Sequence, residues 1–535
     1  MKSAFKPLLI SLLIVSSVYL GTRLIPGDTN LIFNTGRASG IYKMNEIINY
    51  ITDSYVDSIE KDRLIEEGID AMLRDLDPHS FYIPKEDYRE ATESLEGNFE
   101  GVGIEFRIIS DTVMVMTAIP GGPSFKSGVK AGDRIVRVND SLIAGTGIRN
   151  KDVMKLLKGP ELTNVRVGIR RYNADTLMNL IITRDRIPVG SVRSAYMIES
   201  NIGYIRIDRF SKTTYQEFKE ATDKMLDEGM SSLIMDLRDN PGGLLNQSIQ
   251  MANEFLDRDR VIVYTEGKAR PKKMYYADEW GSLMNVDLAI IINEGSASAS
   301  EVLAGAIQDN DRGIIIGRRS FGKGLVQEQL DWPDGSALRL TVARYYTPTG
   351  RSIQKPYTNL EAYHNEALDR YSNGELDIED SIPVVDSLKY FTPAGKVVYG
   401  GGGIVPDIFI PIDSIIHNSF YQELYRLGGV QTFSFRYADS KRQKLLAKYP
   451  TWKQFEDRFK VDDPTYRTFL AFSVSNGVER NTKEAALLRN KIKIDLKAQI
   501  ARHLYGDEGY FPIINRNDEA IERSSRELNA KKRPR

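Results

Sequence analysis

Short runs of apolar residues, each bounded by turn-forming residues, recur through the middle of the chain. Four such runs are too short for helices and are typical of buried β-strands; they lie at residues 203–207, 232–237, 288–292 and 313–317. These runs, with a helix expected to begin at the serine run 295–301, are typical of an α/β core. In such cores, sites form at the carboxyl ends of the strands.

Helical periodicity dominates on both sides of this core. An Asp-Pro-His-Ser turn at residues 77–80 closes the amino-terminal region, and we interpret its His79 as structural rather than catalytic. Aromatic residues at helical spacing and an amphipathic stretch at 482–504 predict a helical domain over 416–535. The amino-terminal region, 37–95, carries one apolar stripe made of Leu64, Ile65, Ile69, Met72 and Leu73.

The first 26 residues have the composition of an export segment. Lys2 and Lys6 precede an apolar run at 8–20, which is short beside the roughly 20 residues that a spanning helix needs. No Ala-x-Ala cleavage site follows, so a cleaved signal peptide and an uncleaved membrane anchor both remain open. Either one predicts export of the rest of the chain.

Composition narrows the possible functions. A chain of 535 residues is too long for one core and predicts three or four structural units. Lys and Arg total 72 against 73 Asp and Glu, so the chain has no basic footprint for nucleic acid, and its basic tail at 531–535 is too short for one. Without cysteine there are no disulfides, no thiol nucleophile and no cysteine-ligated metal.

An acidic segment interrupts the core between about 355 and 390. Glu375, Asp377, Glu379 and Asp380 lie in it, and such a charge cluster is typical of a solvated surface loop. It has no metal-ligand pattern, so we predict no metal site there.

Ser298 is the candidate nucleophile. It lies in the run Gly-Ser-Ala-Ser-Ala-Ser-Glu at 295–301, between a strand and a helix, and a serine hydroxyl needs a neighbouring base. Ser298 and Glu301 also match a capping box, so Ser298 can be read simply as a helix cap. No Gly-x-Ser-x-Gly elbow is present. None of the four histidines lies in a Gly/Ser-rich segment; they are His79, His364, His417 and His503.

Lys323, 25 positions after Ser298 in a Phe-Gly-Lys-Gly run, is the candidate base. A lysine can serve if burial lowers its pKa from about 10.4 toward about 7, which costs roughly 4 kcal/mol. The flanking glycines would let the backbone crowd the amine and exclude water. Gln327, four residues on, either orients this amine or occupies a polar strand face.

The turn that follows the strand at 232–237 is the candidate oxyanion hole. It contains Asn-Pro-Gly-Gly at 240–243, and glycines let backbone amides approach a ligand closely. The amide of Ala299, together with that of Gly242 or Gly243, would stabilise the oxyanion that acyl transfer generates.

These motifs together resemble those of the C-terminal processing peptidases, also called tail-specific proteases. The matching segments are 236–245, 295–301, 321–327 and 343–348. The resemblance implies a serine endopeptidase in which Ser298 is the nucleophile, Lys323 is the general base and Gln327 supports it, with no metal and no other cofactor. It also implies a crotonase-like α/β core at 187–413 in a multidomain α/β protein.

The same resemblance implies a PDZ domain at 96–186, which binds the carboxyl termini of protein substrates. The peptide would add a β-strand, and backbone amides would hold its carboxylate. The carboxylate-binding loop would be residues 101–106, which begin with Gly101, Val102 and Gly103; Ile104, Phe106, Met154 and Leu157 would line the pocket for the last side chain.

The function we predict is therefore cleavage of bacterial envelope proteins on the periplasmic side, by an enzyme that is exported or anchored in the inner membrane. An adaptor protein and a second copy of the chain are further candidate partners, and nucleic acid is not. Two alternatives belong to other classes: a PDZ adaptor whose protease core is inert, and a ligand-binding or acyl-CoA protein on the crotonase-like fold.

Overall fold

The computed structural model describes residues 39–171, 176–278 and 281–531. The chain divides into two compact units between Leu76 and Asp77. The first unit contains two helices, α2 (Ser39–Ser54) and α3 (Lys61–Arg74). The export segment predicted at 1–26 lies outside the described residues. Over the ranges just given, no helix combines the length and the apolarity that crossing a bilayer requires.

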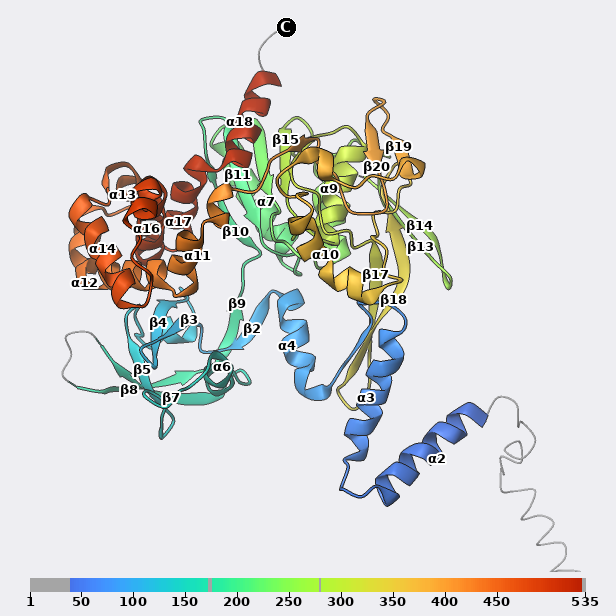
Figure 1. Ribbon diagram of the computed structural model, residues 1–535, viewed down its shortest axis with the longest axis horizontal. Helices are drawn as coiled ribbons and strands as arrows, with labels where there is room; N and C mark the ends of the chain where they lie inside the picture. Colours follow the sequence, from blue (N-terminus) through green and yellow to red (C-terminus); the bar gives the residue numbers. More distant parts are fainter. Residues whose placement is uncertain (1–38, 172–175, 279–280, 532–535) are drawn as a thin grey trace, which may run out of the picture. The chain divides into compact units, whose positions relative to one another are not determined.

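A six-stranded sheet forms the centre of the second unit (Figure 1). Its order is β10-β11-β12-β15-β16-β21; β10 is antiparallel to β11 and the others are parallel. The four predicted strands are β11, β12, β15 and β16. The bounds of all six are β10 (Val192–Met197), β11 (Ile202–Ile207), β12 (Ser232–Asp236), β15 (Asp287–Ile292), β16 (Ile314–Gly317) and β21 (Ile408–Phe409).

Alternate residues of this sheet enter two different cores, as the period of a strand requires. Leu233 and Met235 of β12 face the core that α7 (Thr214–Asp227), α8 (Leu245–Asn253) and α9 (Ala299–Asp309) share. On the opposite face, Ile234 packs with Ala289 and Ile291, and this core includes three residues of the last helix: Ala520, Ile521 and Leu528. Helix α18 (Glu519–Lys531), predicted as part of the C-terminal helical domain, therefore packs on the central sheet.

A second, five-stranded sheet includes β17, which begins shortly after Lys323. In it β1 (Phe81–Ile83) pairs antiparallel with β18, although the region 37–95 was predicted to be helical with a closing turn at 77–82 and no strand. The prediction was wrong here because three residues are too few for a period-2 pattern to be visible; α4 (Lys85–Glu96) follows. The other strands are β13 (Val261–Gly267), β14 (Arg270–Tyr276), β17 (Leu325–Asp331) and β18 (Ala337–Tyr346).

The segment predicted as a peptide-binding module contains its own sheet and core. The sheet order is β3-β4-β5-β7-β8, so β3 is at an edge among the strands that the structure describes. Before and after this sheet, β2 (Asn98–Gly101) pairs with β9 (Asp185–Pro188). Its elements are β3 (Ile104–Ile109), β4 (Thr112–Ala118), α5 (Pro123–Lys126), β5 (Arg134–Val138), β6 (Ser141–Leu142), α6 (Asn150–Leu157), β7 (Asn164–Arg170) and β8 (Met178–Thr183).

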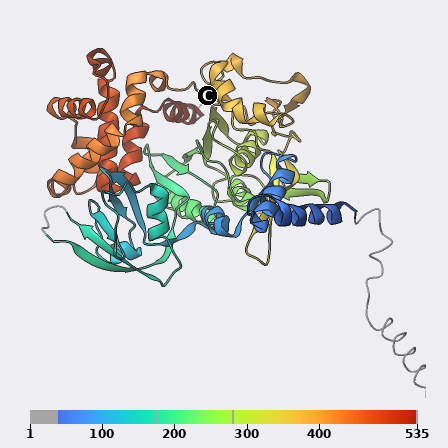
Figure 2. The same ribbon diagram turned by 60° about the horizontal axis from the view of Figure 1, so that its bottom comes forward.

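The helices that follow β21 have a separate apolar core, rich in aromatic residues. Phe435 of this group packs on Met114 and Met116 of β4, so the helices contact the module's sheet (Figure 2). The helices are α11 (Ser419–Arg426), α12 (Gly429–Lys448), α13 (Trp452–Arg458), α14 (Asp463–Ser475), α15 (Thr482–Leu487), α16 (Arg489–Tyr505) and α17 (Asp507–Ile514).

The acidic insertion is more ordered than a solvated loop. It contains α10 (Leu360–Ser372), and Glu375 is only 2% exposed, where it accepts from Arg319 Nε at 2.7 Å and Nη2 at 2.8 Å. The prediction of solvent exposure was therefore wrong for Glu375, since an arginine distant in sequence compensates its burial. It was correct for Asp377, Glu379 and Asp380.

Asp309 and Arg351 form a fully buried ion pair at the end of α9, with 2.7 Å between Asp309 Oδ1 and Arg351 Nη2. We expect Asp309→Ala to lower the free energy of unfolding by about 3–5 kcal/mol, because it leaves a buried guanidinium without its carboxylate. Urea unfolding followed by circular dichroism measures this loss. Asp140→Ala removes an exposed ion pair to Arg166 and should leave the unfolding midpoint unchanged; equal midpoints for both variants would contradict the prediction.

Candidate active site

Ser298 occupies a strained position between β15 and α9. It is the N-cap of α9 with φ +55° and ψ −113°, a conformation that is costly for a residue with a Cβ. Neighbouring residues hold the segment in place: the N–H of Ala297 and the hydroxyl of Ser300 both donate to the carbonyl of Asn240, at 2.9 and 3.0 Å. The strain is thus supported by the segment that follows β12.

Lys323 lies on a loop that is hydrogen-bonded to the serine run, since the N–H of Phe321 donates to the carbonyl of Ser296 at 2.9 Å. Its Nζ donates to Gln327 Oε1 at 3.0 Å. Gln327 follows an irregularity in the pairing of β17 with β18, and such bulges redirect side chains. The predicted contact between the amide of Gln327 and the amine of Lys323 is therefore formed.

Glu301 joins the two candidate catalytic residues through their backbones. It is fully buried, and its Oε2 accepts from the N–H groups of Ser298 at 2.8 Å and Lys323 at 2.9 Å. Its Oε1 accepts from the N–H of Gly322 at 2.7 Å and the hydroxyl of Ser320 at 2.5 Å. Burial raises the pKa of Glu301 to about 7, although the four donors oppose this. The capping box predicted Glu301 near Ser298 but gave no sign of its contact with Lys323.

A second bridge involves the buried Tyr345. Its hydroxyl lies 2.5 Å from the carbonyl oxygen of Lys323 and 3.1 Å from that of Ser298. In the sequence, Tyr345 was noted only as part of the motif at 343–348, because a tyrosine in a strand gives no indication of what its hydroxyl contacts.

The electrostatics around Lys323 favour a neutral amine. Burial lowers the pKa of Lys323, and the charge of Arg339 lowers it further, while Asp77 and Glu301 act in the opposite direction. The net shift is downward, as a lysine base requires.

His79 supports this arrangement from the turn at 77–80. Its carbonyl accepts from Gln327 Nε2, so the turn fixes the amide that holds Lys323. Its ring Nε2 lies 2.7 Å from the hydroxyl of Tyr363 on α10. Burial and the nearby charge of Lys323 lower the pKa of His79 to about 4, so its ring is neutral at neutral pH. The assignment of His79 as structural missed this positioning contact, which its backbone makes.

The two glycines of the turn after β12 differ in what their amides do. The N–H of Gly242 donates to Asn240 Oδ1 at 2.9 Å, and a Cβ on Gly242 would lie 2.7 Å from Ser298 Cβ. For the N–H groups of Gly243 and Ala299, the described part of the chain supplies no acceptor. The geometry therefore favours Gly243 over Gly242 as the partner of Ala299.

One cleft of about 640 Å³ brings these residues together. All six predicted catalytic and oxyanion residues line it, beside apolar walls from α8 and β17. The lining includes Ser298, Ala299, Gly242, Gly243, Lys323, Gln327, Leu245, Val302, Leu325, Arg339 and Tyr345. Across the described ranges, no group of three or more histidine and acidic residues is arranged to hold a metal.

The predicted peptide-binding residues lie elsewhere, from the end of β2 to the start of β3 and on α6. Gly101, the last residue of β2, lies close to the C-terminal end of α6, because a Cβ on it would come 3.6 Å from the carbonyl oxygen of Leu157. Ile104 and Phe106 of β3 are partly buried against the core that contains Leu157, whereas Met154 is 38% exposed.

Comparison with known proteins identifies relatives of most of the chain. Residues 201–359 match the model of peptidase family S41, and residues 420–506 match a family of unknown function, DUF8443. The chain is 36% identical over 349 residues to the carboxy-terminal-processing protease of Bartonella bacilliformis, covering 64% of this chain and 79% of that one. It is 32% identical over 338 residues to the carboxy-terminal processing protease CtpA of Bacillus subtilis, covering 62% and 72%.

Two solved structures are also similar. The photosystem II D1 C-terminal processing protease is 27% identical, with a TM-score of 0.36, over 70% of this chain and 87% of that one. The PDZ domain of a carboxy-terminal protease from Vibrio cholerae, in complex with a peptide, is 27% identical, with a TM-score of 0.16, over 17% and 99%.

We expect Arg339→Gln to raise the pKa of Lys323, because a neighbouring positive charge disfavours the protonated amine. Competitive acetylation with acetic anhydride across a pH series, with mass spectrometry of the Lys323 peptide, measures that pKa. Arg339→Lys keeps the charge and serves as the matched control. An unchanged pKa in Arg339→Gln would show that burial alone lowers it.

Proposed function

The chain is a serine protease that belongs to peptidase family S41, the carboxy-terminal processing proteases, and from this premise we propose a catalytic dyad of Ser298 and Lys323. The observation that carries the proposal is the double bridge between them. The carboxylate of Glu301 and the hydroxyl of Tyr345 each contact the backbones of both Ser298 and Lys323. Ser298 and Lys323 line the same cleft.

In the proposed reaction Ser298 Oγ attacks the scissile carbonyl while Lys323 Nζ accepts its proton. The tetrahedral oxyanion receives hydrogen bonds from the N–H groups of Ala299 and Gly243. Lys323 then gives the proton to the leaving amine, and it later deprotonates the water that hydrolyses the acyl-enzyme. Gln327 Oε1 keeps the amine in place through these steps.

We further propose that residues 96–186 form a PDZ domain that binds the carboxyl terminus of the substrate, beside a crotonase-like core at 187–413. The edge position of β3 supports this, because an added peptide strand needs an unpaired edge. The loop of Gly101, Val102 and Gly103 precedes that edge and would hold the terminal carboxylate.

The proposed setting is the bacterial cell envelope. The apolar run at 8–20 behind Lys2 and Lys6 supports export. An inert PDZ adaptor and an acyl-CoA protein are poorer candidates, since the chain is a serine protease by family.

Ser298→Ala and Lys323→Ala should each lower kcat/KM on an unfolded protein substrate by about 10³-fold or more, because the dyad acts as a unit. Lys323→Arg keeps the charge but does not give up its proton near neutral pH, so it should be equally inactive. Labelling of Ser298 by a fluorophosphonate, followed by mass spectrometry, should disappear in both lysine variants. Cleavage at the parent rate by any of these variants would contradict the proposed dyad of Ser298 and Lys323.

Peptide binding tests the PDZ proposal in the full-length Ser298→Ala protein, measured by fluorescence anisotropy. A peptide with an apolar last residue and a free carboxylate should bind at least about 10-fold more tightly than the same peptide with an amidated end, since the amide cannot accept the bonds that the loop offers. Phe106→Ala should weaken binding of the free peptide. Equal affinity for the free and amidated peptides would contradict carboxylate recognition.

A further inference from the structure

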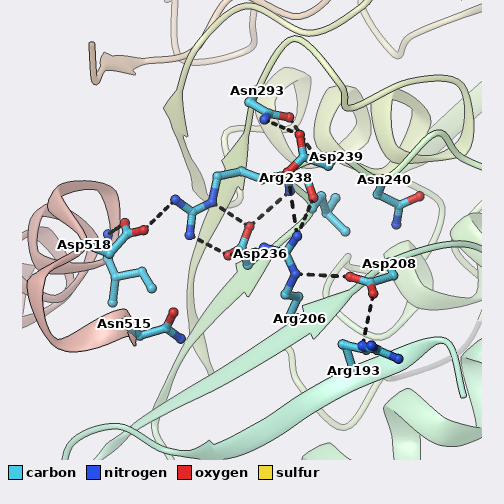
Figure 3. A network of polar contacts seen from close by, with 12 residues as sticks. Arg193, Arg206, Asp208, Asp236, Arg238, Asp239, Asn240, Asn293, Asn515 and Asp518 are labelled. Atoms are coloured by element: carbon cyan, nitrogen blue, oxygen red, sulfur yellow. Dashed lines mark hydrogen bonds and ion pairs between the residues drawn. The ribbon is translucent and has the colours of Figure 1, made fainter. Parts of the chain in front are cut away.

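The segment after β12, which supplies the proposed oxyanion glycine, begins in a network of charged residues around the buried Asp236 (Figure 3). Asp236 is fully buried at the end of β12, and Arg238 binds it through two nitrogens, at 2.9 Å from Nε to Oδ1 and 2.6 Å from Nη2 to Oδ2. Burial alone would raise the pKa of Asp236, but Arg238 and Arg206 hold it at about 2. The carboxylate is therefore ionised.

Arg238 has a second carboxylate partner, which is distant in the sequence. Its Nη1 donates to Asp518 Oδ2 at 2.7 Å, although 280 residues separate the two. Asp236 is shared between two guanidinium groups, since Arg206 Nη1 also lies 3.3 Å from its Oδ2. Asp518 therefore supplies a second carboxylate that Arg238 would otherwise lack, just as Asp208 does for Arg206 at 3.1 Å.

The backbone connects Arg238 to the cleft within a few residues. The carbonyl of Arg238 accepts from Arg206, and the next residue, Asp239, has φ +61° and donates its N–H to Asn293 at 2.8 Å. Asn240 then accepts from the serine run and orients Gly242 against Ser298. A displacement of Arg238 would therefore shift the segment 239–243, which carries the proposed oxyanion N–H of Gly243.

Asp518 is itself held in place by two independent means. Its Oδ1 accepts from the N–H of Ile521 at 3.1 Å, so the same carboxylate caps α18 and binds Arg238. The helix is docked separately, because Ala520, Ile521 and Leu528 are buried against the central sheet. Helix α18 thus presents Asp518 to Arg238 from a fixed position.

From these contacts we infer that Asp518 is a positioning residue for the proteolytic reaction: through Arg238 it holds the segment 239–243 so that Gly243 is aligned for the oxyanion. The inference rests on the proposed oxyanion hole. It makes the C-terminal helix α18 part of the catalytic apparatus, although α18 lies outside both segments of the chain that match known families.

The test uses Asp518→Asn in the full-length protein, because asparagine caps helices as well as aspartate but has no charge for Arg238. We expect kcat on a short peptide substrate to fall about 10-fold, less than the 10²–10³ lost with a whole oxyanion donor, while KM and the melting temperature stay at parent values. Asn529→Ala is the matched control, since Asn529 joins α18 to Glu199 by an exposed hydrogen bond away from Arg238. It should keep the parent kcat.

A peptide aldehyde, whose adduct with the serine mimics the tetrahedral state, distinguishes positioning from a general structural role. Its affinity should fall by the same factor as kcat in Asp518→Asn, whereas binding of the cleaved product peptide should not change. Parent values of kcat and aldehyde affinity would overturn the inference, and so would a lowered melting temperature with product binding weakened in parallel. Ser298→Ala, assayed alongside, separates the two levels: if it remains active the proposed function fails, whatever Asp518→Asn does.

Discussion

The hydrogen bonds accepted by the buried carboxylate of Glu301 are the interactions on which the geometry of the cleft depends. Two loops from different parts of the chain carry Ser298 and Lys323, and each loop presents N–H groups that would be unsatisfied in the interior. One carboxylate accepts from both loops and so sets their separation. Its own burial is costly and the four donors offset part of that cost; the ionised carboxylate, which only accepts hydrogen bonds, is suited to a site where these four neighbours donate.

Around this centre, each part of the catalytic apparatus has support from a segment far away in sequence. The turn at 77–80 holds Gln327 through the carbonyl of His79, and the insertion reaches the same turn through Tyr363. Arg370 of the insertion also donates to the carbonyls of Arg319 and Ser320, on the loop that leads to Lys323. The core is therefore not self-contained: its flanking segments complete the surroundings of its reactive groups.

The parts that could be predicted from the sequence are those with a local signal. The apolar runs predicted the parallel strands, and the motifs around Ser298, Lys323 and Gln327 predicted residues that lie on one cleft. What could not be predicted depends on contacts between distant residues: the pairing of Phe81–Ile83 with β18, the burial of Glu375 against Arg319, and the link from Glu301 to Lys323. The period of α18 indicates an apolar face, but no local pattern says that this face packs on β12 and β15.

The docking of α18 also has a consequence in time. A chain is made from its amino terminus, and domains generally fold as they emerge. Here one face of the central sheet, including Ile234 and Ile291, shares its core with residues of α18, which lies far later in the chain. This face of the sheet therefore stays partly exposed until α18 has packed against it. A chain cut before α18 would keep an exposed apolar surface of the kind that chaperones and other proteases recognise.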